Sequence, residues 1–121
     1  MTINSAIEAV DALQPNAFSR AEKITWLSRA EGIVKTGILD TCQAAPEFSG
    51  YTPETDPDRE LLVPEPFDEL YLRYLQAQMD SANGELLRYA NSASLFNTAL
   101  NAYRNHYIRT HKPLGVRMNY F

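Results

Sequence analysis

The chain has 121 residues, a formal charge of -4 and a pI near 5.1, and a chain of this size typically forms one domain with a modest core. The acidic balance argues against a nucleic-acid groove, because phosphate binding needs clustered Lys and Arg side chains. The single cysteine, Cys42, excludes an intrachain disulfide and a Cys-x-x-Cys pair, and no apolar run approaches the ~20 residues that span a bilayer.

Two helices are predicted in the N-terminal part of the chain. Each opens with a Ser-x-x-Glu pattern typical of a capping box, at Ser5 and at Ser19. The first ends before Pro15, and the second has Gly37 as its C-terminal stop. The apolar residues at helical spacing are Ile3, Ile7, Val10 and Leu13 in the first helix and Ile24, Leu27, Val34 and Ile38 in the second.

The pattern then stops over residues 40–65, which contain four prolines and show no sustained period. Long irregular segments in compact domains are commonly binding segments or segments ordered by a partner. The stretch "ELLV", Glu60 to Val63, has the composition of a short strand. Such a strand would need another segment or another subunit to pair with.

A strong helical pattern runs from Pro66, at the first helical position, to Tyr107. A chain of this size cannot cover such a rod along its length, so a reversal is expected. We place it at Asn91-Ser92, and Asn83-Gly84 is the alternative. The predicted fold is therefore an all-α small bundle with two N-terminal helices, a long irregular segment and a C-terminal antiparallel helical hairpin. We expect residues 1–113 to form a single domain and residues 114–121 to form a flexible, extended tail.

No residue pattern indicates catalysis or a cofactor. His106 and His111 are five positions apart, whereas helical metal pairs are three or four apart. The run "ETDPDRE" lacks the Gly and the bidentate Glu of a calcium loop and is interpreted as an exposed acidic turn. Cys42 has no recognisable nucleophile motif around it. We therefore expect no metal, no cofactor and no enzyme activity.

Aromatic residues allow two interpretations. Tyrosines in the predicted hairpin are either core residues or parts of an interface, since Tyr supplies a large contact area at small entropic cost. Both interpretations can hold for different members of the set. Tyr120 and Phe121, beyond Gly115, either pack on the chain's own helices or dock on a partner. The hairpin tyrosines are Tyr71, Tyr74, Tyr89, Tyr103 and Tyr107.

Several stretches of the chain resemble a known family. These are "LLVPEPFDELYLRYL", "ANGELLRYANSASLFNTAL" and "AYRNHYIRTHKP" within residues 60–113, and "ALQPNAFSRAEKITWLSRAEG" nearer the N-terminus. Together they resemble the head–tail connector proteins (neck adaptor or head-completion proteins) of tailed bacteriophages. The resemblance covers most of the chain, is weakest over residues 37–55 and includes no catalytic motif.

The resemblance implies a helical structural protein of the virion neck, made in the cytoplasm of the bacterial host. It implies a homo-oligomeric ring, commonly twelvefold, that lies beneath the portal protein and contacts the next neck or tail component. The ring helps to retain packaged DNA, which passes through without specific binding, and no membrane is involved. The residues predicted to contact neighbouring subunits are Leu61, Leu62 and Val63, and those predicted to dock on the portal are Met118, Tyr120 and Phe121.

A second class of protein fits the same pattern. A small helical regulatory or interaction module, monomeric or dimeric, would dock a partner through the tyrosine-lined hairpin.

Overall fold

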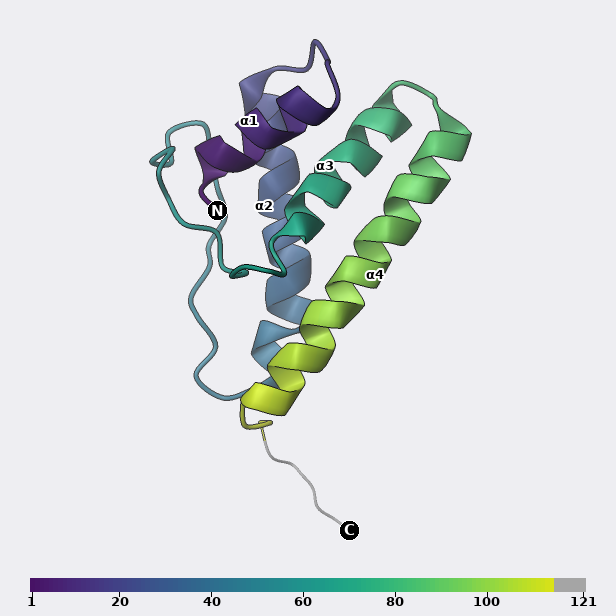
Figure 1. Cartoon of the computed structure of the whole chain (residues 1–121). Helices are drawn as coiled ribbons and strands as arrows, with labels where there is room; N and C mark the ends of the chain where they lie inside the picture. Colours follow the sequence, from purple (N-terminus) through teal and green to yellow (C-terminus); the bar gives the residue numbers. More distant parts are fainter. Residues whose placement is uncertain (115–121) are drawn as a thin grey trace.

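A computed structural model describes residues 1–114. This part of the chain contains four α-helices, one short 3-10 helix and no strand, so the all-α prediction is confirmed (Figure 1). The elements are α1 (Ile3–Leu13), α2 (Arg20–Gly37), η1 (Leu39–Thr41), α3 (Glu69–Ala82) and α4 (Leu86–Thr110). None of the helices described is long and apolar enough to cross a membrane.

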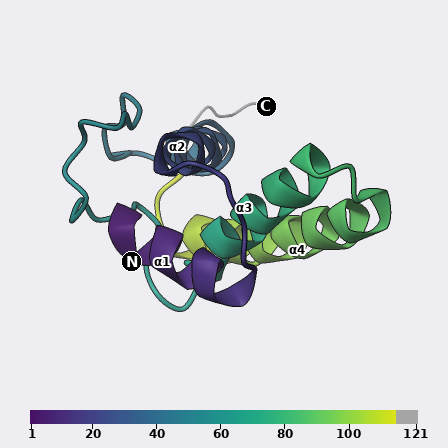
Figure 2. The same cartoon turned by 90° about the horizontal axis from the view of Figure 1, so that it is seen from above.

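The helices α3 and α4 form an antiparallel hairpin, as predicted, and α2 packs against α3 (Figure 1). Seen from above, α2 is viewed nearly end-on, and α1 lies beside it and beside α3 (Figure 2). The irregular segment between η1 and α3 runs along the side of α2 that faces away from the hairpin.

The core is built from the apolar faces that the helical spacing predicts. The fully buried members from the helices include Ile3, Val10, Ile24, Leu27, Val34, Leu70, Tyr71, Leu75 and Met79. The longer helix α4 contributes Phe96, Leu100, Tyr103 and Tyr107. Burying such faces supplies most of the stability of helices that would be marginal in isolation.

The capping prediction is correct for α2 and wrong for α1. Ser19 caps α2 through a reciprocal capping box with Glu22. In α1 the cap is Thr2, and Ser5 completes the box, so the helix begins one turn earlier than predicted. The reason is tertiary, since Thr2 is extended and forms an antiparallel bridge with Glu60, which fixes where the helix starts.

The reversal between α3 and α4 lies at Asn83-Gly84, so the prediction of Asn91-Ser92 is wrong. Gly84 has φ +72°, a left-handed conformation that glycine adopts without steric cost. The Gly84 N–H donates to the Ser81 carbonyl oxygen at 3.1 Å and closes the turn. Ser92 is buried inside α4, where its hydroxyl donates to Asp80 at 2.7 Å. The Ser92 side chain therefore bonds to a residue of α3 and does not cap a helix.

The start of α3 also differs from the prediction. Pro66 was expected at the first helical position, but α3 begins at Glu69. The residues before it form a turn in which Phe67 N–H donates to the Pro64 carbonyl oxygen at 2.9 Å. The chain therefore completes a turn between Pro64 and Phe67 before α3 begins.

The stretch from Glu60 finds its pairing partner in the chain's own N-terminal residues. Leu61 N–H donates to the Met1 carbonyl oxygen at 2.9 Å, and Ile3 N–H donates to the Arg59 carbonyl oxygen at 3.1 Å. The pairing amounts to a single bridge and not a strand. It gives the Leu61 N–H and the Arg59 carbonyl oxygen partners within the chain, without another subunit.

Candidate interaction surface

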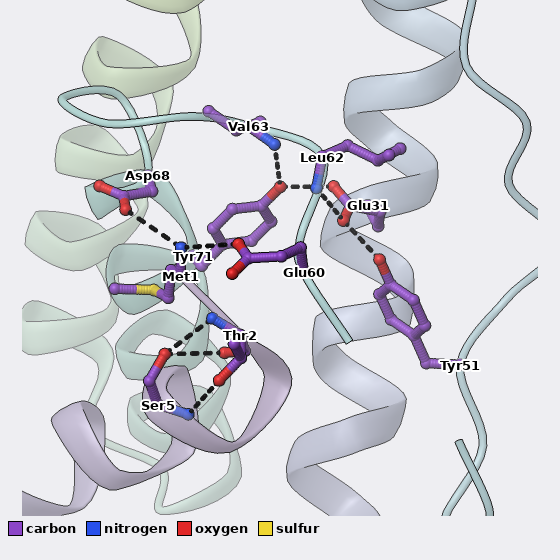
Figure 3. A network of polar contacts seen from close by, with 10 residues as sticks. All are labelled: Met1, Thr2, Ser5, Glu31, Tyr51, Glu60, Leu62, Val63, Asp68 and Tyr71. Atoms are coloured by element: carbon purple, nitrogen blue, oxygen red, sulfur yellow. Dashed lines mark hydrogen bonds and ion pairs between the residues drawn. The ribbon is translucent and has the colours of Figure 1, made fainter. Parts of the chain in front are cut away.

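A buried carboxylate on α2 holds the irregular segment in place. The Glu31 side chain is 0 % exposed. Its Oε2 accepts hydrogen bonds from Tyr51 Oη at 2.7 Å and from the Leu62 backbone N–H at 2.9 Å, and its Oε1 accepts one from Tyr71 Oη at 2.5 Å (Figure 3). Tyr71 Oη in turn accepts from the Val63 N–H at 2.9 Å. We call these five residues the Glu31 network; they satisfy a group that is costly to bury alone.

The electrostatics of this network keep the tyrosine hydroxyls protonated. Burial and the adjacent Glu31 carboxylate raise the pKa of Tyr51 and of Tyr71 well above their ordinary value. Each hydroxyl therefore remains a hydrogen-bond donor to the carboxylate. Solvent does not reach Glu31, so its carboxylate is not accessible to a substrate in this structure. The network instead holds the irregular segment against α2 and α3.

The prediction that Leu61, Leu62 and Val63 face another subunit depended on their being exposed. Leu61 and Val63 are only 6 % and 0 % exposed and pack into the chain's own core, and Leu62 is half-buried against it. The assumption that Leu61 and Val63 are exposed is therefore wrong, and the subunit contact itself stays a prediction. The cause is the Glu31 network, which draws the backbone of Leu62 and Val63 against α2 and α3. The residues predicted to dock on the portal, Met118, Tyr120 and Phe121, lie outside the described residues.

The sequence analysis did not single out Glu31, although a signal was present. Glu31 falls between Leu27 and Val34 on the predicted apolar face of α2. A carboxylate at such a position is almost never buried without partners. Its position on the apolar face of α2 therefore indicates a buried polar network.

Most of the hairpin tyrosines belong to the core. Tyr71, Tyr103 and Tyr107 are buried, Tyr74 is half-buried and Tyr89 is exposed. Burial raises the pKa of Tyr103 to about 12. The tyrosines therefore do not line an open groove along the hairpin, which removes the main structural support for a tyrosine-lined docking surface.

The histidines of α4 and its C-terminal end have aromatic neighbours. His111 stacks on Tyr107 with ring centroids 3.7 Å apart, and His106 lies against Phe67 at 4.8 Å. Within residues 1–114 no three His, Cys, Asp or Glu side chains gather as a metal site would require. In the acidic run, Asp56 accepts a hydrogen bond from the Asp58 backbone N–H at 2.9 Å, which gives a closed turn.

The most exposed large apolar residues of the described chain lie just after the turn between α3 and α4. Leu86 and Leu87, in the first turn of α4, are 77 % and 89 % exposed. Leu95 lies two turns further along and is partly exposed. We call Leu86, Leu87 and Leu95 the hairpin end. Adjacent leucines with such high exposure are typical of a contact surface.

A groove of about 300 Å³ lies beside the hairpin end, between α3, α4 and the C-terminal end of α1. Asp80 is buried at this groove, where it accepts hydrogen bonds from Gln14 Nε2 at 3.0 Å and from Ser92 Oγ at 2.7 Å. Its walls include Leu87 and Leu95. The volume is at the lower limit for small-molecule sites, and it suits a single large side chain better than a cofactor.

The chain was also compared with known proteins. Comparisons with protein-family models, with curated proteins and with solved structures found no match.

Proposed function

We propose that this protein is a structural component of the neck of a tailed bacteriophage, which forms a ring beneath the portal protein, joins the head to the tail and helps to retain packaged DNA. The sequence resemblance over residues 60–113 is the reason for choosing this class of assembly. The all-α architecture is compatible with it. The acidic chain suits a ring through which DNA passes without being gripped.

The observation that carries the proposal is the hairpin end. The chain buries Leu61 and Val63 of its irregular segment in its own core, yet it leaves Leu86 and Leu87 exposed to water in the first turn of α4. Apolar side chains in such positions are favoured in proteins that assemble, because burying each of them in an interface contributes about 1.5–3 kcal/mol.

The proposal is tested with the purified full-length chain and a purified portal protein. Native mass spectrometry is expected to show several copies of the chain bound to each portal ring. The variant Ile33→Ser, which alters a partly exposed residue on α2, serves as the control and is expected to bind like the wild type. A chain that stays monomeric and ignores the portal would contradict the connector role and favour a small regulatory module.

A further inference from the structure

The charges of the chain are segregated along its length. The first 85 residues hold all 15 Asp and Glu and six of the 11 Lys and Arg, which gives a charge of -9. Residues 86–121 hold five Lys and Arg and no acidic residue, which gives a charge of +5. The fold places an exposed surface of each sign in the described chain, one at the C-terminal end of α4 and one in the irregular segment.

The C-terminal end of α4 combines exposed cations with apolar side chains that are more than half exposed. We call this surface the basic end; its members are Ile108, Arg109, Lys112 and Leu114. Within residues 1–114 neither Arg109 nor Lys112 takes part in an ion pair. Asp40, on η1 at the same end of the fold, is already paired with Lys35 at 2.6 Å. The basic end therefore fits an acidic surface that also offers apolar contacts.

The irregular segment carries such a surface in its closed turn. Residues 53–58, "PETDPD", contain three carboxylates and two prolines, all exposed, and we call them the acidic turn. No ion pair of the described chain involves Glu54, Asp56 or Asp58. The cation that follows, Arg59, lies over the Tyr51 ring, with its guanidinium 5.9 Å from the ring centroid. Nowhere else in residues 1–114 do three exposed carboxylates lie so close together in sequence, which selects this turn as the matching surface.

The acidic turn has a fixed conformation. The Asp58 N–H donates to Asp56 Oδ1 and the Arg59 N–H donates to the Asp56 carbonyl oxygen, both at 2.9 Å. The turn lies between Tyr51 and Leu62, the two residues through which the segment bonds to the buried carboxylate of α2, and takes no part in that network itself. A turn that is already ordered loses little conformational entropy when it binds a partner.

The acidic turn and the basic end lie apart in one molecule. The acidic turn lies beside the start of α1, where the Asn4 N–H donates to the Pro57 carbonyl oxygen at 2.9 Å. The basic end lies beside η1, just after α2, where the Leu114 N–H donates to the Thr41 carbonyl oxygen at 3.3 Å. Figure 1 shows the irregular segment running along α2 from the one place to the other. A contact between the two surfaces therefore joins two molecules.

We propose that the basic end of one copy binds the acidic turn of a second copy, with Arg109 and Lys112 paired to Glu54 and Asp58. The contact joins two different surfaces, so repeating it closes a ring or extends a filament. The inference rests on the proposed function for its setting, since it assigns the contact between neighbouring subunits of the proposed ring. It leaves the hairpin end for the portal or for the next neck component.

The test measures self-association of the full-length chain without portal, by sedimentation velocity over a range of concentrations. Arg109→Glu/Lys112→Glu reverses the charge of the basic end. Glu54→Lys/Asp58→Lys reverses the charge of the acidic turn and keeps Asp56, whose side chain closes the turn. Each double variant is expected to raise the concentration needed for association at least about tenfold, because like charges then face each other.

A matched control separates this contact from a general effect of charge. Glu8→Lys/Glu47→Lys changes two exposed glutamates elsewhere and shifts the net charge by the same amount as the variant of the acidic turn. It is expected to associate like the wild type. Circular dichroism and the melting temperature establish that every variant is folded.

Mixing the two charge-reversed variants gives the sharpest result. The reversed basic end of one variant then meets the reversed acidic turn of the other, and the two unchanged surfaces also match. The mixture is expected to associate at the concentration that the wild type needs, although neither variant does so alone. Raising the salt from about 50 mM to about 300 mM is expected to weaken association of the wild type and of the mixture alike.

Several outcomes would overturn the inference. These are wild-type association of either charge-reversed variant alone, a mixture that does not recover, and a wild type that stays monomeric. Binding of a DNA duplex that Arg109→Glu/Lys112→Glu abolishes, with self-association unchanged, would also overturn it and assign the basic end to nucleic acid. If several copies bind the portal while the charge reversals leave self-association unchanged, the inference fails and the proposed function stands. Charge-dependent assemblies that ignore the portal would support the inference and contradict the proposed function.

Discussion

The irregular segment is buried more completely than its irregular backbone suggests, whereas the regular helical hairpin leaves apolar side chains exposed. Residues 42–68 form no helix, yet Tyr51, Leu61 and Val63 from this segment are buried and its polar groups bond to Glu31. The hairpin is regular throughout, yet its end carries Leu86 and Leu87 in water. Regularity of backbone and completeness of burial are therefore separate properties in this protein.

The difference shows where to look for a partner. An irregular segment is a weak indication of an interface when a buried acceptor gathers its backbone N–H groups, as Glu31 does here. An apolar helix face is a stronger indication of an interface when it extends beyond the segments that cover it. Each of the following predictions tests one side of this comparison.

The largest loss of stability is expected from Glu31→Ala, which removes the acceptor that holds the irregular segment against the helices. The change leaves three donors without an acceptor, and each costs about 1–3 kcal/mol, so the free energy of unfolding should fall by roughly 3 to 9 kcal/mol. Urea denaturation measures the loss. Glu54→Ala, an exposed glutamate in the same segment, is the control and should change stability by less than about 0.5 kcal/mol. Equal losses in the two variants would show that the network contributes nothing.

A pair of leucine substitutions compares the two regions directly. Leu61→Ala, in the irregular segment, should cost about 2–5 kcal/mol because it empties a buried site. Leu87→Ala, in α4, should cost less than about 0.5 kcal/mol because its side chain is already in water. Both values come from urea denaturation of the chain at a concentration where it is monomeric. If the helical leucine were the more costly of the two, the contrast between the regions would be refuted.

Alkaline pH probes the protons of the buried tyrosines. The pKa of Tyr51, Tyr71 and Tyr103 is raised in the folded chain above the ordinary 10.0. Stability from these hydroxyls is therefore present below pH 10 and is lost as pH rises, because the unfolded chain releases the protons first. At about pH 11 each of these tyrosines should lower the free energy of unfolding by roughly 1 kcal/mol.

The measurement is the free energy of unfolding at a series of pH values above neutrality. Tyr51→Phe should weaken the decline at high pH by the contribution of one group. A stability that does not change between neutral pH and about pH 11 would contradict the raised pKa values.

Small effects on stability are expected from substitutions of two glycines, and they should have opposite signs. Gly84→Ala forces an alanine into the left-handed region at the hairpin turn and should destabilise the chain by about 1–2 kcal/mol. Gly32→Ala lies within α2, where an added Cβ meets no atom within 4 Å, and should stabilise it by about 0.5–1 kcal/mol. Thermal unfolding of the two variants beside the wild type measures both. A stabilising Gly84→Ala would mean that the reversal does not depend on this turn.

Local periodicity determined much of the fold. The apolar stripes of α1 and α2 and the reciprocal cap at Ser19 follow from spacing and from nearest neighbours, which a sequence states directly. The two good turn signals at Asn83-Gly84 and Asn91-Ser92 could not be ranked in this way. Ser92 stays helical because Asp80 of the facing helix accepts its hydrogen bond, and that partner exists only once the hairpin has formed.

The candidate surface divides in the same manner. The sequence by itself determined that the chain is helical, where α1 ends, where α2 begins and ends, and which stretch is irregular. Only the tertiary structure decided that Leu61 and Val63 are inside and that Leu86 and Leu87 are outside, although all four read alike as apolar residues. The physical reason is that burial depends on which distant groups meet, and a single buried carboxylate on α2 directs one pair inward while nothing in the described chain covers the other.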